Sequence, residues 1–150
     1  MPVITASGAA FLLAVLWFDL MFDVQVRRHR SGVLPTDVLT SVAAYYRRVT
    51  TEASPMNMLV SAVMLITIAS IGFELANGSV LRPFAAASLG LTLVAVGTAA
   101  TRTVKNARRL GAQTDTPDEQ SRLARLIYRD HIVCFAAMAA TFAIHIANMA

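Results

Sequence analysis

The sequence predicts an all-α fold, a four-helix transmembrane bundle, from three observations. Of the 150 residues, 56% are hydrophobic and only 15% are charged. The apolar residues form four long blocks instead of the short alternating runs of a soluble core. Each block has about 20 residues, and an α-helix of that length spans roughly the 30 Å of hydrocarbon in a bilayer. We expect a single membrane domain.

The four expected spans cover residues 3–24, 56–76, 83–103 and 130–149. No Lys or Arg precedes the first block, whereas Arg27, Arg28 and Arg30 follow it. A signal peptide has the opposite order, with its basic residues before the apolar stretch. We therefore expect the first block to be a retained span.

The basic residues predict how the bundle is oriented. Of the 13 Lys and Arg residues, five lie between the first and second blocks, seven between the third and fourth, and one, Arg82, in the second loop. Cytoplasmic loops carry the excess of basic residues, so loops one and three should be cytoplasmic and both termini outside. The pI near 10 thus reflects the basic residues that orient the protein in the membrane. We expect the lipid bilayer as its partner and no nucleic acid.

The first loop should contain an amphipathic helix over residues 36–52. Pro35 precedes Thr36 and Asp37, either of which could cap the helix start. Apolar side chains then recur at helical spacing: Leu39, Val42, Ala43, Tyr46 and Val49. This interfacial helix could lie along the inner membrane surface, or it could cover the cytoplasmic end of the bundle, and the two placements are compatible.

The third loop should be largely helical. No breaker follows the third span before Gly111, which is a suitable C-terminal cap. Thr116 to Glu119 then form a capping box, with Pro117 at the first helical position, and this helix can run unbroken into the fourth span. Asp118 and Arg122 should pair at i, i+4.

A layer of polar residues is expected at the cytoplasmic margin of the membrane. A charged side chain inside a bilayer is costly, so each one is a candidate for function. Asp19 lies about one turn deeper than Asp23 and should need a partner such as Arg102 or Arg129 to stay charged. The predicted topology places nine candidates at about this level: Trp17, Asp19, Asp23, Asn57, Arg102, Asn106, Arg129, Asp130 and His131.

These residues suggest a site for an amphipathic small molecule. We predict catalytic roles for His131 as general base, Asp19 as a second proton acceptor and Arg102 as the group that holds the developing anion. The other six would bind the ligand, with Trp17 beside Phe18 and Phe22 as an apolar wall. The alternative is an ion pair that only fixes helix order. Asp19, Asp23 and His131 are too few donors for us to assign a metal, and the sequence leaves the cofactor unknown.

A smaller polar cluster is expected at the outer side, where Glu74 should meet His145 near Asn77, Arg82 and Asn148. An interhelical hydrogen bond accounts for this pair more simply than a proton relay. His131 and His145 also lie about 21 Å apart on one helix, a spacing like that of paired haem ligands. The other spans contain no histidine, so only a symmetric dimer could complete haem sites.

The order of motifs resembles the small four-span bacterial membrane proteins grouped with the anthrone-oxygenase-like family. The shared pieces are Trp17-Phe18-Asp19, Leu34-Pro35, Tyr45-Tyr46-Arg47-Arg48, Thr103-Val104-Lys105-Asn106 and Arg129-Asp130-His131. The resemblance implies the four-span fold, the bacterial inner membrane and a cofactor-free oxygenation of an aromatic substrate. Tyr128 stands where that family usually has a Trp.

Two functions follow as hypotheses. One is a binding or catalytic site for an amphipathic or aromatic small molecule, and whether it is an enzyme is open. The other is a helix-bundle interaction module, either a homo-oligomer or an accessory subunit, in which small residues allow close helix contact: residues 6–10, 85–90 and 136–143. Transport is a third hypothesis with less support, because a four-helix monomer has little room for a transport path and only an oligomer would have one.

Overall fold

The computed structural model describes residues 2–149, and over this range the chain is helical with no strand. Its elements are α1 (Pro2–Arg27), α2 (Thr36–Arg47), η1 (Arg48–Glu52), α3 (Ser54–Asn77), α4 (Arg82–Thr98), η2 (Ala99–Thr103), α5 (Val104–Ala112) and α6 (Pro117–Ala147). The two η elements are π-helical turns. Four continuous helices, 2–27, 55–77, 82–112 and 117–147, are long and apolar enough to cross a membrane. The predicted all-α fold with four such helices is confirmed.

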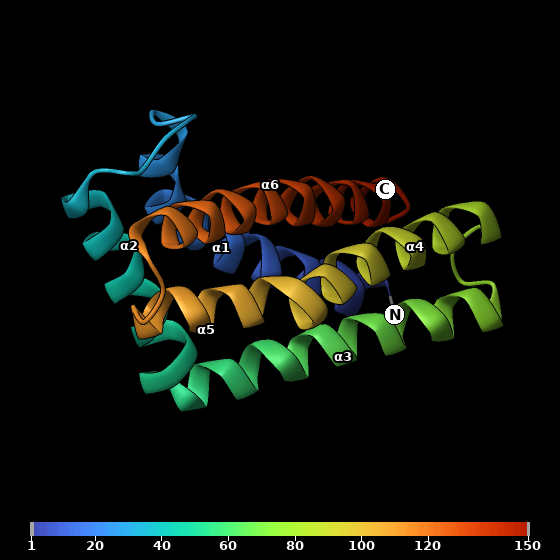
Figure 1. Cartoon of the computed structure of the whole chain (residues 1–150). Coiled ribbons are helices and arrows are strands. Elements are labelled where there is room, and N and C mark those ends of the chain that lie inside the picture. The colour runs from blue at the N-terminus through green and yellow to red at the C-terminus, as the bar shows by residue number, and fades with distance from the viewer. Residues whose placement is uncertain (1, 150) are drawn as a thin grey trace.

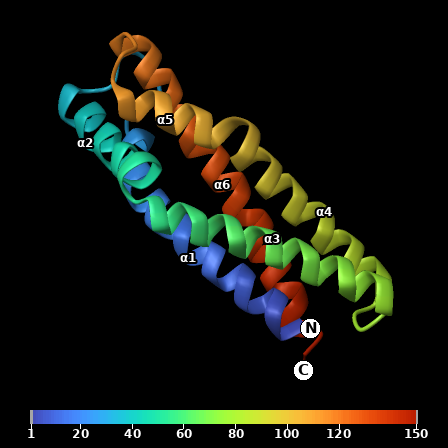
Figure 2. The ribbon, with the colours of Figure 1, turned by 90° about the horizontal axis from the view of Figure 1, so that it is seen from below.

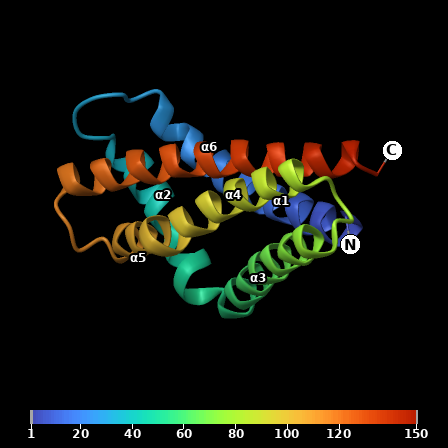
Figure 3. The same ribbon diagram turned by 90° about the vertical axis from the view of Figure 1, so that its right-hand side faces the viewer.

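The four long helices lie side by side, and the ends of the bundle differ (Figures 1 and 2). Both termini and the turn between α3 and α4 lie at one end, which we call the terminal end. The helix α2 and the turn between α5 and α6 lie at the other, the α2 end. The helix α6 packs against α1 and α4, whereas α3 lies on the far side of the bundle from α6 (Figure 3).

Local capping explains where α6 begins. Thr116 is the N-cap, and its side chain accepts a hydrogen bond from the backbone N–H of Glu119 at 3.4 Å. From there α6 runs without a break to Ala147, as the capping box predicts. Arg122 pairs with Glu119 at i, i+3 through two hydrogen bonds of 2.7 Å, so the expected partner Asp118 is replaced by the next residue.

The start of α2 and the end of α5 differ from expectation. Pro35 is the N-cap of α2 and Thr36 is already helical, so neither Thr36 nor Asp37 caps the helix. The helix α5 ends at Ala112, and Gln113 adopts the left-handed conformation with φ 54°. Gly111 is therefore not the cap.

Gly111 instead allows α5 to approach α2. A Cβ atom at this position would lie 2.7 Å from the backbone nitrogen of Arg47 and 2.9 Å from its Cα. Real side-chain contacts are not that short, so only glycine fits here. The position is fixed by packing between helices, which the local sequence pattern does not reveal.

The apolar face of α2 packs on protein. Leu39, Val42, Ala43 and Tyr46 are buried against α5, α6 and the end of α1. They form the α2-end core together with Val26, Leu34, Ala107, Leu110, Leu123, Ala124 and Ile127. This is the arrangement expected of a helix that covers the end of the bundle. A separate bundle core consists of Ala9, Leu12, Ala95, Cys134, Ala137 and Met138.

Candidate functional site

His131 lies on α6 at the α2 end of the bundle, between two carboxylates of α1. Its Nδ1 is 2.7 Å from Oδ2 of Asp23, and its Nε2 is 3.8 Å from Oδ2 of Asp19. Asp19 and Asp23 are four residues apart, so one face of α1 presents both to α6. The His131 and Asp23 side chains are buried.

The hydrogen bonds around Asp23 indicate which nitrogen of His131 carries a proton. The Tyr46 hydroxyl donates to Oδ1 of Asp23 at 2.5 Å. Burial, together with the carboxylates of Asp23 and Asp19, raises the pKa of Tyr46 above its usual range, so the phenol remains a donor. The carboxylate can then accept a second hydrogen bond, from the Nδ1–H of His131. In the neutral imidazole this leaves the lone pair on Nε2.

Asp19 is held by α2. The Tyr45 hydroxyl donates to Oδ1 of Asp19 at 2.6 Å, and the Tyr45 ring stacks on Phe22 with centroids 4.0 Å apart. Burial, followed by the effect of the Asp19 carboxylate, also raises the pKa of Tyr45. The partners of Asp19 are therefore Tyr45 and His131, in place of the expected Arg102 or Arg129.

Arg102 and Asp130 form a separate pair. The Arg102 guanidinium donates to both carboxylate oxygens of Asp130, with Nε at 2.9 Å from Oδ2. Thr103 also donates to Oδ2 of Asp130, at 3.2 Å. Both donors lie in the π-helical turn η2. Such wide turns shift the register of the residues that follow and are frequent at functional sites.

Four of the predicted residues lie outside these contacts. Trp17 is exposed, with its ring 6.3 Å from that of Phe135. Asn57 donates to the Thr50 carbonyl at 3.3 Å. Among residues 2–149 no side-chain hydrogen bond or ion pair was found for Asn106 or Arg129. The structure thus joins Asp19, Asp23 and His131 in what we call the His131 cluster, with Tyr45 and Tyr46, beside the Arg102–Asp130 pair.

Three members of these groups were not predicted from the sequence: Tyr45, Tyr46 and Thr103. Helical spacing did place Tyr46 on the buried face of α2, next to Ala43 and Val42. A buried tyrosine hydroxyl needs a polar partner, so the predicted burial of Tyr46 could have indicated a contact with a nearby carboxylate.

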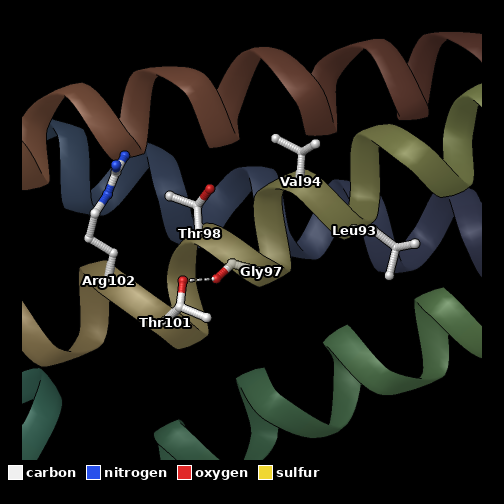
Figure 4. Close-up of a pocket in the computed structure, with 6 residues that line it drawn as sticks. All are labelled: Leu93, Val94, Gly97, Thr98, Thr101 and Arg102. Atoms are coloured by element: carbon white, nitrogen blue, oxygen red, sulfur yellow. Dashed lines mark hydrogen bonds between the residues drawn. The ribbon is translucent and has the colours of Figure 1, made fainter.

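A hollow of about 390 Å³ lies beside Arg102 along α4 and η2. It is lined by Leu93, Val94, Gly97, Thr98, Thr101 and Arg102, and Figure 4 shows Arg102 reaching from η2 toward α6. The Arg102 side chain is 58% exposed although it is paired with Asp130. The hollow is open and mostly apolar, with one cation at its end.

A second polar group, the His145 cluster, lies at the terminal end. Nε2 of His145 is 2.8 Å from Oε2 of Glu74, and both side chains are fully buried. The Thr5 hydroxyl lies 2.8 Å from both Oε1 of Glu74 and the Ser70 hydroxyl. The expected meeting of Glu74 and His145 is confirmed. Asn77 and Asn148 instead bond near their own helix ends, to the Ser79 N–H and the Ile144 carbonyl.

The His145 cluster shares one proton between its two titratable groups. Nδ1 of His145 is 2.9 Å from the Thr141 carbonyl, which can only accept, so Nδ1 carries a proton. The 2.8 Å contact between Nε2 and Glu74 needs one more. The pair is therefore either imidazolium with carboxylate or imidazole with carboxylic acid, and its net charge is zero in both forms.

No group of three or more His, Cys, Asp or Glu side chains able to hold a metal ion was found within residues 2–149. Comparison of the chain with protein-family models, with curated proteins and with solved structures gave no match.

Proposed function

We propose that this chain is a multi-pass protein of the bacterial inner membrane. It binds an amphipathic aromatic molecule at the cytoplasmic end of its bundle, where His131 accepts a proton from that ligand. The observation that carries this proposal is that Nδ1 of His131 is held by Asp23, while Nε2 has no hydrogen bond among the described residues and lies 3.8 Å from Asp19. The basic residues of the first and third loops favour an orientation with the α2 end in the cytoplasm.

The surroundings of His131 suit a general base. Asp23 fixes the ring and its tautomer, which leaves the lone pair of Nε2 available. Proton transfer would create an imidazolium between Asp23 and Asp19, and both carboxylates would stabilise that charge. The Tyr45 and Tyr46 hydroxyls hold these carboxylates in place.

The ligand class follows from what lies around the His131 cluster. Trp17 and Phe18 are exposed at the same level of α1, and aromatic rings offer flat apolar contacts. Arg102 is the candidate to hold the anion left after proton removal, because its guanidinium is partly exposed beside an apolar hollow. An apolar ring system with one acidic group would match both features.

The resemblance to anthrone-oxygenase-like proteins suggests the reaction. A methylene group that lies in one ring with a carbonyl group, and is conjugated with it through the flanking aromatic rings, loses a proton to His131, and O2 oxidises the resulting carbanion. One oxygen atom of O2 becomes the new carbonyl oxygen, and the other leaves as water with the two hydrogens of the methylene group. No cofactor is required by this balance.

The test uses anthrone as the probe and the protein in lipid nanodiscs. The chain has a single tryptophan, Trp17, so quenching of its fluorescence reports binding, while an oxygen electrode reports turnover. We expect His131→Gln to bind anthrone normally and to lose turnover by about 100-fold or more, the usual contribution of a general base. His29→Gln, which changes the histidine of the first loop, is the control.

Two results would contradict the proposal. Equal turnover in wild type and His131→Gln would remove His131 from the chemistry, and absence of saturable quenching would reject the aromatic ligand class. If His131→Gln fails to fold, Asp19→Asn replaces it, because this variant keeps a hydrogen-bond acceptor for Tyr45. It should lower the turnover without changing the thermal midpoint by more than a few degrees.

A second function, a homo-oligomeric interaction module, is favoured by the half of α3 nearest the α2 end. Residues 55–66 include no buried side chain, and Met58 and Leu65 are 72% and 67% exposed. A second copy of the chain could cover this face. We expect Leu65→Cys to form a disulfide-linked dimer in membranes, whereas Leu93→Cys, on α4, should not; monomers from both variants would count against the module.

A further inference from the structure

A small basic hollow lies where α5 meets the end of α2, apart from the His131 cluster. Its volume is about 220 Å³, and it is lined by Arg47, Thr51, Arg108, Gly111 and Ala112. A water molecule takes about 30 Å³, so a phosphate group and several waters would fit. Figure 1 shows the end of α2 beside α5.

The hollow exists because of Gly111. With no Cβ at this position, α5 lies directly on the backbone of Arg47. Arg108 is three residues before Gly111, so it lies on the same side of α5, close to the approach point. The contact therefore brings Arg47, Thr51 and Arg108 around one space.

The charge of the hollow is not balanced within the described chain. Arg47 pairs with Glu52 at 3.3 Å, but both side chains are more than half exposed, so the pair is weak. No ion pair involving Arg108 was found among residues 2–149, whereas its neighbour Arg109 pairs with Asp115 and Glu119. Two arginines and a hydroxyl around a space without a carboxylate in its lining favour an anion with several acceptor oxygens.

The position of the hollow indicates where the anion comes from. Thr51 lies four residues before Pro55, where the membrane-crossing part of α3 begins. In the orientation proposed above, the hollow is therefore at the level of the lipid headgroups on the cytoplasmic side. Basic pockets at this level bind the phosphates of anionic lipids.

We propose that Arg47, Thr51 and Arg108 form a phosphate-binding site that holds the headgroup of an anionic phospholipid. Arg108 supplies the unpaired guanidinium, and Arg47 turns from Glu52 to the phosphate. The site rests on the proposed membrane orientation but not on the role of His131.

The test measures lipid binding to the intact chain by native mass spectrometry. Phosphatidylglycerol and phosphatidylcholine are titrated into the detergent-solubilised protein, and inorganic pyrophosphate is titrated separately. We expect one phosphatidylglycerol to bind in preference to phosphatidylcholine, and Arg108→Gln to weaken it about fivefold, as expected for one arginine near a membrane surface. Arg28→Gln removes an equal charge from an exposed residue after α1 and should leave the affinity unchanged.

Further variants separate the outcomes. Arg108→Lys should keep part of the affinity, and Gly111→Ala should abolish it by moving α5 away from α2 while anthrone quenching of Trp17 persists. Pyrophosphate binding with the same variant pattern would support the phosphate site with a soluble ligand as its occupant. Equal loss in Arg108→Gln and Arg28→Gln, or equal binding of both lipids, would overturn the proposal.

Discussion

The two polar clusters of this bundle contain the same pair of groups in different settings. At each end a histidine of α6 lies within 2.8 Å of a carboxylate, from Asp23 of α1 at the α2 end and from Glu74 of α3 at the terminal end. The ring of His145 has a partner for both nitrogens, and its side chain is fully buried. His131 has a hydrogen-bond partner only at Nδ1 among the described residues, because its Nε2 lies 3.8 Å from Asp19.

The two histidines differ in whether Nε2 has a hydrogen bond, and this difference suggests different roles for the two clusters. A closed, fully bonded pair stabilises helix packing and has no free atom to offer a ligand. A pair with one free nitrogen, next to exposed aromatic rings and a second carboxylate, can accept a proton. The function proposed above therefore requires chemistry at the His131 cluster and only a structural role for the His145 cluster, and the following variants test that division.

The largest effect should come from Glu74→Ala. It leaves Thr5 and His145 buried without their shared partner, so the free energy of unfolding should fall by about 3 to 5 kcal/mol. Thermal unfolding in detergent measures this loss. Anthrone turnover per folded molecule should be unchanged, and a selective loss of turnover would break the comparison.

Glu74→Gln sharpens the assignment of the shared proton. If the pair is imidazole with carboxylic acid, glutamine can donate to Nε2 and accept from Thr5, so the cost should be only about 1 kcal/mol. A cost equal to that of Glu74→Ala would instead indicate imidazolium with carboxylate.

Gly8→Ala tests how tightly the terminal end is packed. A Cβ at Gly8 would overlap the Thr67 hydroxyl on α3, so either Thr67 gives up its hydrogen bond to the Val63 carbonyl or α1 and α3 move apart. We expect a loss of about 1 to 3 kcal/mol in thermal unfolding experiments. Gly90→Ala is the matched control, because its Cβ would meet no atom within 4 Å, and it should cause no loss.

At the α2 end, Tyr46→Phe should cost more than Tyr45→Phe. Tyr46 is buried and donates to the Asp23 carboxylate, a type of hydrogen bond that contributes about 2 kcal/mol. Tyr45 is partly exposed, so loss of its hydrogen bond should cost only about 0.5 kcal/mol, the lower end of the usual range. Unfolding of both variants under the same conditions checks the order, and equal losses would show that the two carboxylates are held alike.

The smallest effect is a pH dependence confined to alkaline conditions. The folded state raises the pKa of Tyr46, so the unfolded chain loses this proton first as the pH rises. The stabilisation is fully present below about pH 10, the ordinary tyrosine pKa, and declines above it. Comparing thermal midpoints at increasing pH should show a smaller decline in Tyr46→Phe than in wild type, and parallel declines would contradict this assignment.

The sequence predicted features that depend on length and local pattern. Four apolar blocks gave four helices long enough to cross a membrane, and the capping box gave the start of α6. Glu74 and His145 could be matched because both lie near the same end of long helices. The depth of a residue in a membrane-spanning helix can be predicted by counting residues from the end of the span.

The sequence did not reveal how the helices are rotated and where α2 packs. The partner of Asp19 is Tyr45 because α2 lies across α1, and no periodicity encodes that placement. Arg102 lies inside the turn η2, which changes the helical register after α4, and it reaches Asp130 instead of Asp19. The close contact between Gly111 and Arg47 could not be predicted either, because the two residues are 64 positions apart in the chain.

If the four long helices cross a membrane as proposed above, the length of α6 places the two cores of the protein in different solvents. Its 31 residues extend over about 46 Å, some 16 Å more than the hydrocarbon of a bilayer. In the proposed orientation, the α2-end core is assembled against water and held by the hydrophobic effect, whereas the bundle core is assembled against lipid and held by close contact of small residues. Urea should therefore loosen the α2 end first, and a harsh detergent the bundle, although one unbroken helix belongs to both.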